Sequence, residues 1–229
     1  MKRLVVLIPG WGSAVPYLKS SRIKKQFQKH GYDVAVVGGY PDLGLGCIKD
    51  NAARIDQQIQ DLNYREIVFV GHSMGGLVAR QLVAQHDYSP TAIVTLGTPH
   101  KGAKLSSLLN GISESMIQMN PGSEFLKELD AATHEVPVLS ITGSLDFVVP
   151  KQNLDWAESV EVPKVTHLGL VASKRVFYEA WSWLTYDIFG EPGPYTDIEG
   201  ISIDITLNEF LPGKIFLHEL FGEKPVFWR

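Results

Sequence analysis

Short apolar runs alternate with longer amphipathic segments along most of the chain. The run at residues 4–8 contains only Leu, Val and Ile, as in a strand that is buried on both faces. Residues 48–62 instead place apolar side chains three and four positions apart, which is the spacing of one helix face. Strands are predicted in this way at residues 4–8, 34–37, 66–70, 92–96, 136–141 and 159–165. Helices are predicted at residues 17–30, 48–62, 75–86 and 173–189.

This alternation predicts an α/β fold with a mostly parallel sheet of about six strands, flanked by helices. Strands separated by helices pair in parallel through right-handed crossovers, which place helices on both faces of the sheet. In such sheets, ligands bind in the loops at the carboxyl ends of the strands. Functional residues are therefore expected in the loops that follow residues 8, 37, 70, 96, 141 and 165.

The end of the chain has a different pattern. Residues 191–194 read as a linker (EPGP), and residues 201–207 then alternate between apolar and polar positions, as in a strand with one apolar face. A turn at residues 212–213 and an apolar segment at residues 215–220 complete a predicted β-hairpin. The chain is thus expected to divide into a domain at residues 1–190 and an extension at residues 191–229. An isolated hairpin is marginally stable, so its apolar surface must be buried against its own domain, a second copy of the chain or a membrane-like substrate. We expect it to cover its own domain beside the site or to pair in a homodimer.

Composition narrows the function mainly by exclusion. The 229 residues are 45% hydrophobic and 20% charged, which is ordinary for a globular protein with a sizeable core. A net charge of −4 offers no basic face for nucleic acid, and a single cysteine, Cys47, excludes an intrachain disulfide. The first apolar run is too short for a signal peptide, and none reaches the roughly 20 residues of a membrane-spanning helix. We expect a soluble, cytoplasmic protein.

The strand at residues 66–70 runs directly into GHSMG at residues 71–75 and then into a predicted helix. A serine between glycines at such a junction is the pattern of a nucleophile elbow, which aims the hydroxyl of Ser73 into the cleft. The neighbours must be glycines because larger side chains would collide with the adjacent strand and helix. The helix N-terminus also favours developing negative charge. The alternative is a tight turn in which the serine is incidental.

A serine hydroxyl becomes a nucleophile only with a base, and the base needs an orienting carboxylate. The loop after the fifth predicted strand holds one carboxylate, Asp146, and the loop after the sixth strand holds His167. Both lie at strand ends and follow Ser73 in the order serine, acid, histidine. We therefore predict Ser73, Asp146 and His167 as a catalytic triad. His100 follows the fourth strand and is expected to shape the cleft wall rather than to act as the base.

Acyl transfer also requires two N–H donors for the oxyanion. The backbone N–H of Met74, next to the nucleophile, is one, and we assign the other to Trp11 in the loop after the first strand. Gly10 and Gly12 flank Trp11 and let the backbone approach the substrate closely.

The same glycines nearly form a dinucleotide-binding motif, GxGxxG. That reading fails because Val15 occupies the position of the third glycine and no acidic residue ends the second strand. The sequence also lacks a Walker lysine, HExxH and CxxC. We therefore expect neither a cofactor nor a metal.

Four segments together resemble the lipase and esterase branch of the α/β-hydrolase superfamily: GHSMGG at 71–76, GTPHKG at 97–102, the Asp146 loop and HLGL at 167–170. GTPHxG is the most specific, because it recurs in triacylglycerol lipases and related acyl-ester hydrolases. The resemblance covers about residues 3–188. It implies cofactor-independent hydrolysis of acyl esters through a serine-bound acyl intermediate.

Residues 103–135 replace a simple crossover helix in this pattern. Their apolar positions fall on one helical face, at Leu105, Leu108, Leu109, Ile112 and Met116. This face either packs on the sheet or forms a short lid that meets an acyl chain. The shortness of the segment favours an esterase for soluble or medium-chain esters. Its substrate contacts are predicted at Gly10, Gly12, His100, Leu105, Leu109 and Met116.

Other functions remain open at this point. A thioesterase, amidase or acyltransferase would use the same triad, because the tetrahedral intermediate is shared. A non-catalytic hydrolase fold used for binding belongs to a different class of protein. It predicts a broken triad or a filled oxyanion loop, and the sequence has neither feature.

Overall fold

The computed structural model describes most of the chain. The described residues are 3–12, 18–19, 21–38, 40, 42–86, 90–103, 113–132 and 136–191. They belong to two compact units, Met1–Trp181 and Ser182–Arg229. Two sets of predictions lie outside the described residues. They are the hairpin at residues 201–220 with its homodimer contact, and the lid residues Leu105 and Leu109. These expectations, and the domain boundary at residue 190, stay predictions.

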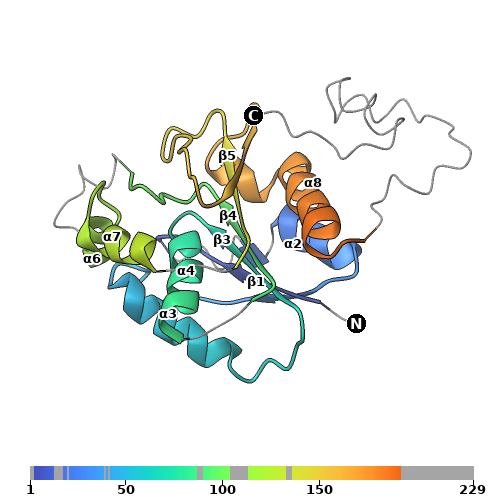
Figure 1. Ribbon diagram of the computed structural model, residues 1–229, viewed down its shortest axis with the longest axis horizontal. Coiled ribbons are helices and arrows are strands. Elements are labelled where there is room, and N and C mark those ends of the chain that lie inside the picture. Colours follow the sequence, from blue (N-terminus) through green and yellow to red (C-terminus); the bar gives the residue numbers. More distant parts are fainter. Residues whose placement is uncertain are drawn as a thin grey trace, which may run out of the picture. The chain divides into compact units, whose positions relative to one another are not determined.

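The first unit contains one sheet of six parallel strands in the order β2-β1-β3-β4-β5-β6 (Figure 1). The strands are β1 (Leu4–Ile8), β2 (Asp33–Val36), β3 (Ile67–His72), β4 (Ala92–Leu96), β5 (Val138–Gly143) and β6 (Glu158–Val162). The predicted fold class is confirmed, and the strand ends differ from the predicted ones by three residues or fewer. The strand order reverses beside β1, which pairs with β2 on one side and β3 on the other. Ligands bind at such a switch point in open α/β sheets.

Helices flank the sheet. They are α2 (Arg22–Lys29), α3 (Ile48–Ile59), α4 (Met74–His86), α6 (Glu114–Gln118), α7 (Glu124–Ala131) and α8 (Lys174–Trp183). Figure 1 shows α3, α4, α6 and α7 on one face of the sheet, and α2 with α8 on the other. On the first face, Val6, Phe69 and Ile93 join a core cluster with residues of these four helices. On the other face, the rings of Phe27 and Phe177 meet edge to face at 5.0 Å.

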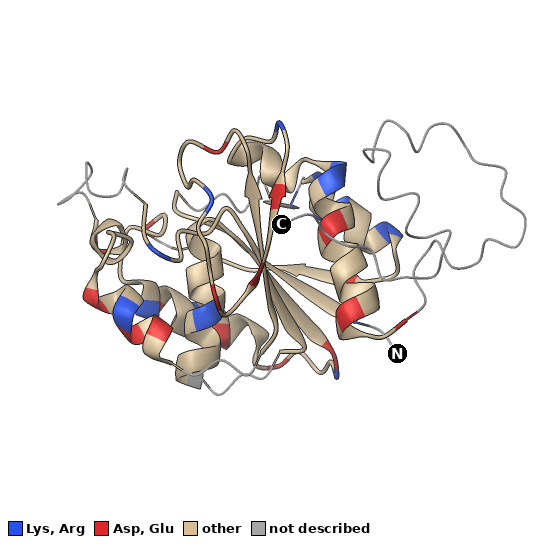
Figure 2. Cartoon of the chain, turned by 45° about the horizontal axis from the view of Figure 1, so that its top comes forward, with Lys and Arg blue, Asp and Glu red and all other residues tan. Residues whose placement is uncertain are grey.

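The central strands owe their burial to their sequence. β1, β3, β4 and β5 contain no Lys, Arg, Asp or Glu. Figure 2 shows these charged residues mostly on the helices and the connecting segments. Strands covered on both faces need mostly apolar, uncharged side chains at successive positions, which is why these predominantly apolar runs predicted strands from the sequence.

The described part of residues 103–135 forms two short helices, α6 and α7. Each begins at a serine whose side chain accepts a backbone N–H: Ser113 from Met116, and Ser123 from Leu126. Met116 is only 7% exposed and belongs to the core cluster. The described part of this segment therefore packs on the domain, and its movement as a lid stays a prediction.

In the second unit, the described residues continue from α8 into a π-helical segment, η2 (Leu184–Ile188). Together α8 and η2 occupy nearly all of the helix predicted at residues 173–189. None of the helices in the described part of the chain has the length and apolar character needed to cross a membrane.

Candidate active site

Ser73 occupies a sharp turn between the end of β3 and the start of α4. Its φ is +56°, in the left-handed region that residues other than glycine rarely adopt. The turn is held on both sides: the Ser73 N–H donates to Leu96 O at 2.8 Å, and Thr98 Oγ1 donates to Ser73 O at 2.9 Å. Strained backbone that the surroundings hold in place is typical of functional sites. The geometry is that of the predicted elbow.

The glycines around Ser73 are required by close backbone contacts. A Cβ atom at Gly71 would collide with the backbone of Gly75 and Gly76, and one at Gly75 would collide with Ile8 O. A Cβ atom at Gly10 would lie 2.8 Å from Ser73 Cβ. The loop after β1 therefore lies directly against the serine, as the predicted oxyanion loop must.

Asp146 and His167 form a close pair. Asp146 follows β5, is 4% exposed, and its Oδ2 accepts a hydrogen bond from His167 Nδ1 at 2.7 Å. Its other oxygen, Oδ1, accepts the N–H groups of Val148 at 3.0 Å and Val149 at 2.8 Å. A carboxylate oxygen accepts, so His167 Nδ1 is the donor of this bond. The role of His167 Nε2 as a base stays a prediction.

The loop after β4 packs against this pair. Gly97 has a φ of +60°, and a Cβ atom there would lie 2.8 Å from Asp146 Oδ2 and 3.0 Å from His167 Nδ1. The first glycine of the GTPHKG segment is thus needed because a side chain at this position would collide with Asp146 and His167.

His72 connects the elbow to His167. Its Nε2 donates to the backbone carbonyl of His167 at 3.0 Å, and the two rings lie 4.8 Å apart. Burial, with a smaller contribution from nearby His167, lowers the pKa of His72 to about 4. His72 is therefore neutral near pH 7, and the carbonyl fixes its proton on Nε2.

This buried histidine predicts a loss of stability in mild acid. The pKa of His72 is lower in the folded chain than the ordinary 6.5 expected for the unfolded chain, so the unfolded chain binds the proton first as the pH falls. The stability that neutral His72 contributes is fully present above about pH 6.5 and is lost progressively as the pH falls to about 4. We expect His72 to make the protein about 2 kcal/mol less stable at pH 5 than at pH 7.5.

Urea denaturation of wild type and His72→Gln at the two pH values measures this difference. Glutamine can still donate to the His167 carbonyl but does not titrate, so the variant should lose less stability between pH 7.5 and pH 5. Equal losses in the two proteins would contradict the assignment.

The two predicted oxyanion donors belong to residues next to the Ser73 turn or to the Gly10 backbone that contacts it. Met74 follows Ser73 as the first residue of α4 and is fully buried, whereas Trp11 follows Gly10 and is 38% exposed. Gly12 has a φ of +81°, and its N–H donates to Leu43 O at 2.8 Å. The loop after β1 is thus held by the loop after β2.

His100 is buried within the protein. It is 1% exposed, its Nδ1 accepts from Arg80 Nη1 at 3.3 Å, and its Nε2 lies 3.0 Å from Thr95 Oγ1. Since an arginine can only donate, the His100 proton lies on Nε2, which donates to Thr95. These bonds hold the loop after β4, and a contact between His100 and substrate stays a prediction.

Sequence reasoning missed Arg80. This buried side chain donates to Asp130 Oδ1 at 2.9 Å and to Leu129 O at 3.1 Å, and it lies 4.1 Å from the Trp156 ring centre. It joins α4 to α7 beneath the loop that carries His100. A charged residue inside the apolar segment at residues 75–86 was the available signal. Among the described residues, no group of three or more His, Cys, Asp or Glu could hold a metal ion.

The same region of the chain matches a family model. The model, described as a PGAP1-like alpha/beta domain, matches residues 45–180, which is 136 of the 229 residues. The chain belongs to this family. The matched range includes Ser73, Asp146 and His167, and it begins after the loop that carries Trp11.

Curated relatives are named as deacylases and esterases. A GPI inositol-deacylase of Candida albicans is 32% identical over 120 residues, which is 47% of this chain and 26% of the relative. A pimeloyl-[acyl-carrier protein] methyl ester esterase of Yersinia pestis is 30% identical over 96 residues, or 41% of this chain and 36% of the relative. The matches thus span only about a quarter to a third of these relatives.

Solved structures share the fold. The mature lipase BlEst2 of Bacillus licheniformis superimposes with a TM-score of 0.69 at 19% identity, over 80% of this chain and 92% of the lipase. The α/β hydrolase MGS-MChE2, from a lagoon-sediment metagenome, gives a TM-score of 0.62 at 16% identity, over 82% and 92% of the two chains. The prediction of the lipase and esterase branch of the α/β-hydrolase superfamily is confirmed, and the relatives support a hydrolase enzyme.

Proposed function

We propose that this protein hydrolyses carboxylic acyl esters through Ser73, His167 and Asp146. One observation carries the proposal: a buried carboxylate, aligned by two backbone N–H groups, bonds at 2.7 Å to a histidine that His72 holds beside the Ser73 turn. In the proposal, Ser73 is the nucleophile, His167 the base and Asp146 the orienting acid, and the buried Asp146–His167 bond supports these roles.

The proposed reaction proceeds in two halves. His167 Nε2 takes the proton of Ser73 Oγ as that oxygen attacks the ester carbonyl carbon. The Met74 and Trp11 N–H groups donate to the resulting oxyanion. The tetrahedral intermediate then collapses, and the leaving alcohol takes the proton from His167. A water molecule, deprotonated by the same nitrogen, then attacks the acyl carbon and forms a second tetrahedral intermediate. Its collapse breaks the bond to Ser73 Oγ, which takes the proton back from His167, and the carboxylic acid is released.

The names of the relatives favour esters over other acyl substrates. Two groups of relatives are described as a deacylase and a methyl ester esterase. A thioesterase, amidase or acyltransferase would pass through the same intermediate, so the leaving group distinguishes these activities. We keep oxygen esters as the proposal and treat the others as outcomes of its test.

Active-site labelling tests the proposal directly. A fluorophosphonate probe is expected to modify the protein once, on the peptide that contains Ser73, because only an activated serine reacts rapidly. A p-nitrophenyl ester series of increasing acyl length is then expected to be hydrolysed faster than matched thioesters and anilides. An unlabelled protein, or a label on a different serine, would contradict the proposal. Faster turnover of the thioester or the anilide would reassign the substrate class.

A further inference from the structure

The loop after β2 holds the backbone that carries the proposed second oxyanion donor. The structure describes residues 37–38, 40 and 42–47 of this loop. The Tyr40 hydroxyl donates to Pro9 O at 3.4 Å, and the Gly12 N–H donates to Leu43 O at 2.8 Å. Pro9 O belongs to the Pro9–Gly10 peptide group and the Gly12 N–H to the Trp11–Gly12 peptide group. The Trp11 N–H belongs to the peptide group between them. Both neighbours of the donor peptide are therefore fixed by the same loop.

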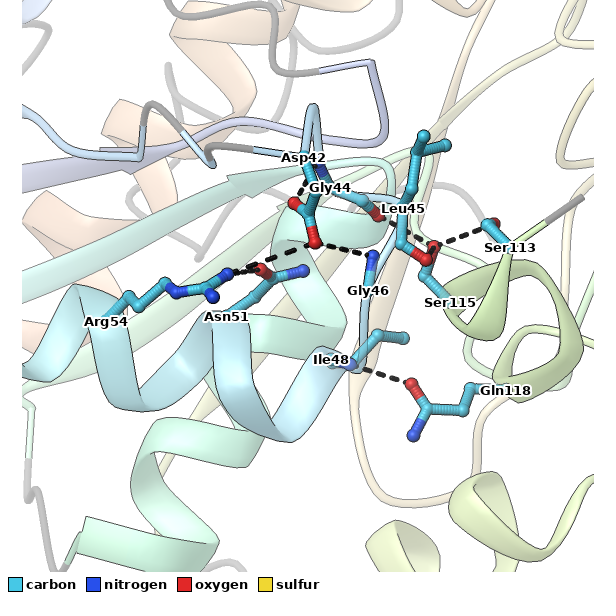
Figure 3. Close-up of polar contacts among 10 residues, drawn as sticks. All are labelled: Asp42, Gly44, Leu45, Gly46, Ile48, Asn51, Arg54, Ser113, Ser115 and Gln118. Atoms are coloured by element: carbon cyan, nitrogen blue, oxygen red, sulfur yellow. Dashed lines mark hydrogen bonds and ion pairs between the residues drawn. The ribbon is translucent and has the colours of Figure 1, made fainter.

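Asp42 fixes the shape of this loop. Its Oδ1 accepts the Gly44 N–H at 3.0 Å, and its Oδ2 accepts the Gly46 N–H at 2.9 Å and lies 3.9 Å from Arg54 Nη1 (Figure 3). Leu43 has a φ of +57°, which is unfavourable for a leucine, so the turn needs these bonds. The carbonyl that receives the Gly12 N–H is thus held in a strained turn by one carboxylate.

Ser115 fixes the loop from the other side. This residue of α6 is fully buried; its Oγ donates to Gly44 O at 2.7 Å and its N–H to Leu45 O at 3.3 Å. Figure 3 shows Ser115 facing the turn, with Gln118 of the same helix accepting the Ile48 N–H at 2.7 Å. Ser115 has no part in the proposed chemistry, and its hydroxyl donates to the Gly44 carbonyl.

The loop also contacts the residue of the first proposed donor. A Cβ atom at Gly44 would lie 3.0 Å from Met74 Cε and 3.2 Å from Tyr40 Cδ2. Burial raises the pKa of the Tyr40 hydroxyl, so this group stays protonated and remains a donor. The loop therefore contacts both the Met74 side chain and the backbone on either side of the Trp11 N–H.

We propose that Asp42 and Ser115 are positioning residues for the oxyanion hole and act through Leu43 and Tyr40 on the Trp11 N–H. This inference rests on the proposed function. An oxyanion donor works because it already lies about 2.7–3.1 Å from the developing charge, and removing one costs about 10²–10³ in kcat. A displaced donor loses part of that effect, and a shift of about 1 Å can cost about 10²-fold.

Two substitutions test the inference. Ser115→Ala removes the hydroxyl that holds Gly44 O, and Asp42→Asn leaves only one oxygen for two N–H groups. Each is expected to lower kcat about tenfold or more while KM stays within about twofold, because the oxyanion exists only in the transition state. Glu128→Gln is the matched control: it breaks the 2.6 Å Lys49–Glu128 ion pair between α3 and α7 without touching the loop, and it should keep wild-type kinetics.

A trifluoromethyl ketone separates positioning from general stability. This inhibitor forms a tetrahedral serine adduct whose oxyanion occupies the hole, so its Ki is expected to rise in parallel with the fall in kcat/KM. A merely structural role would lower the melting temperature and leave kcat and Ki unchanged below it, and that result would overturn the inference. If Ser115→Ala fails to fold, Tyr40→Phe, which removes one hydroxyl without leaving a cavity, applies the same test.

The rate of fluorophosphonate labelling distinguishes the two possible failures. An unlabelled wild type would overturn the proposed function and this inference together. A wild type that is labelled at Ser73, with Asp42→Asn and Ser115→Ala labelled at the same rate, would overturn the positioning role alone. Labelling that is about tenfold slower in both variants, with Glu128→Gln unchanged, is the expected result.

Discussion

Replacing Ser73 by alanine is expected to lower kcat for ester hydrolysis about 10⁴-fold or more. The substitution removes the one oxygen that forms the acyl bond in the proposed reaction. Folding should be retained, because alanine keeps the Cβ atom and the same two bonds of the residue-73 backbone, from its N–H to Leu96 O and from Thr98 Oγ1 to its carbonyl. The measurement is steady-state hydrolysis of a short p-nitrophenyl ester, with the melting temperature taken on the same samples.

A second serine provides the control. Ser144 also lies at the carboxyl edge of the sheet, where its Oγ accepts the Lys164 N–H at 2.8 Å. Ser144→Ala should therefore keep its activity within about twofold of wild type, as expected for a surface substitution away from the chemistry. If Ser73→Ala retained more than a tenth of the wild-type activity, the nucleophile would be misassigned.

The sheet could be predicted from the sequence because its strands are buried on both faces. Residues 4–8 are a continuous apolar run and residues 92–96 are apolar except for Thr95, and the structure has strands at those same residues. The segment at residues 103–135 was harder to predict, since an apolar helical spacing does not distinguish a lid from a helix packed on the sheet. In the structure, the serine caps at Ser113 and Ser123 divide its described part into two short helices.

The candidate site was predictable where its residues follow strands. Topology alone brings the ends of β3 and β5 and the loop after β6 to one edge of the sheet, so the order of Ser73, Asp146 and His167 was informative. The supporting contacts were not predictable in this way. Ser115 lies 71 residues from Gly44, and His72 lies 95 residues from the carbonyl that it holds. Such contacts depend on which loops become neighbours, and local sequence patterns do not encode that.

Replacing Asp146 by asparagine is expected to lower kcat about 10⁴-fold with little change in fold. The asparagine Oδ1 can still accept the Val148 and Val149 N–H groups, which fixes the side chain as it is now. Its NH₂ group then faces His167 Nδ1, where Asp146 Oδ2 accepts at 2.7 Å. That NH₂ group donates to Nδ1, so the ring must carry its proton on Nε2.

A ring protonated on Nε2 cannot take the proton of Ser73, which is why one oxygen-to-nitrogen change should be so costly. Steady-state kinetics of Asp146→Asn check this, and Asp155→Asn is the control because that exposed carboxylate lies outside the hydrogen bonds described for His167. If Asp155→Asn were the damaging change and Asp146→Asn were harmless, the acid would be misassigned. The expected pattern, loss in the first variant alone, would assign the orienting role to the carboxylate that bonds His167.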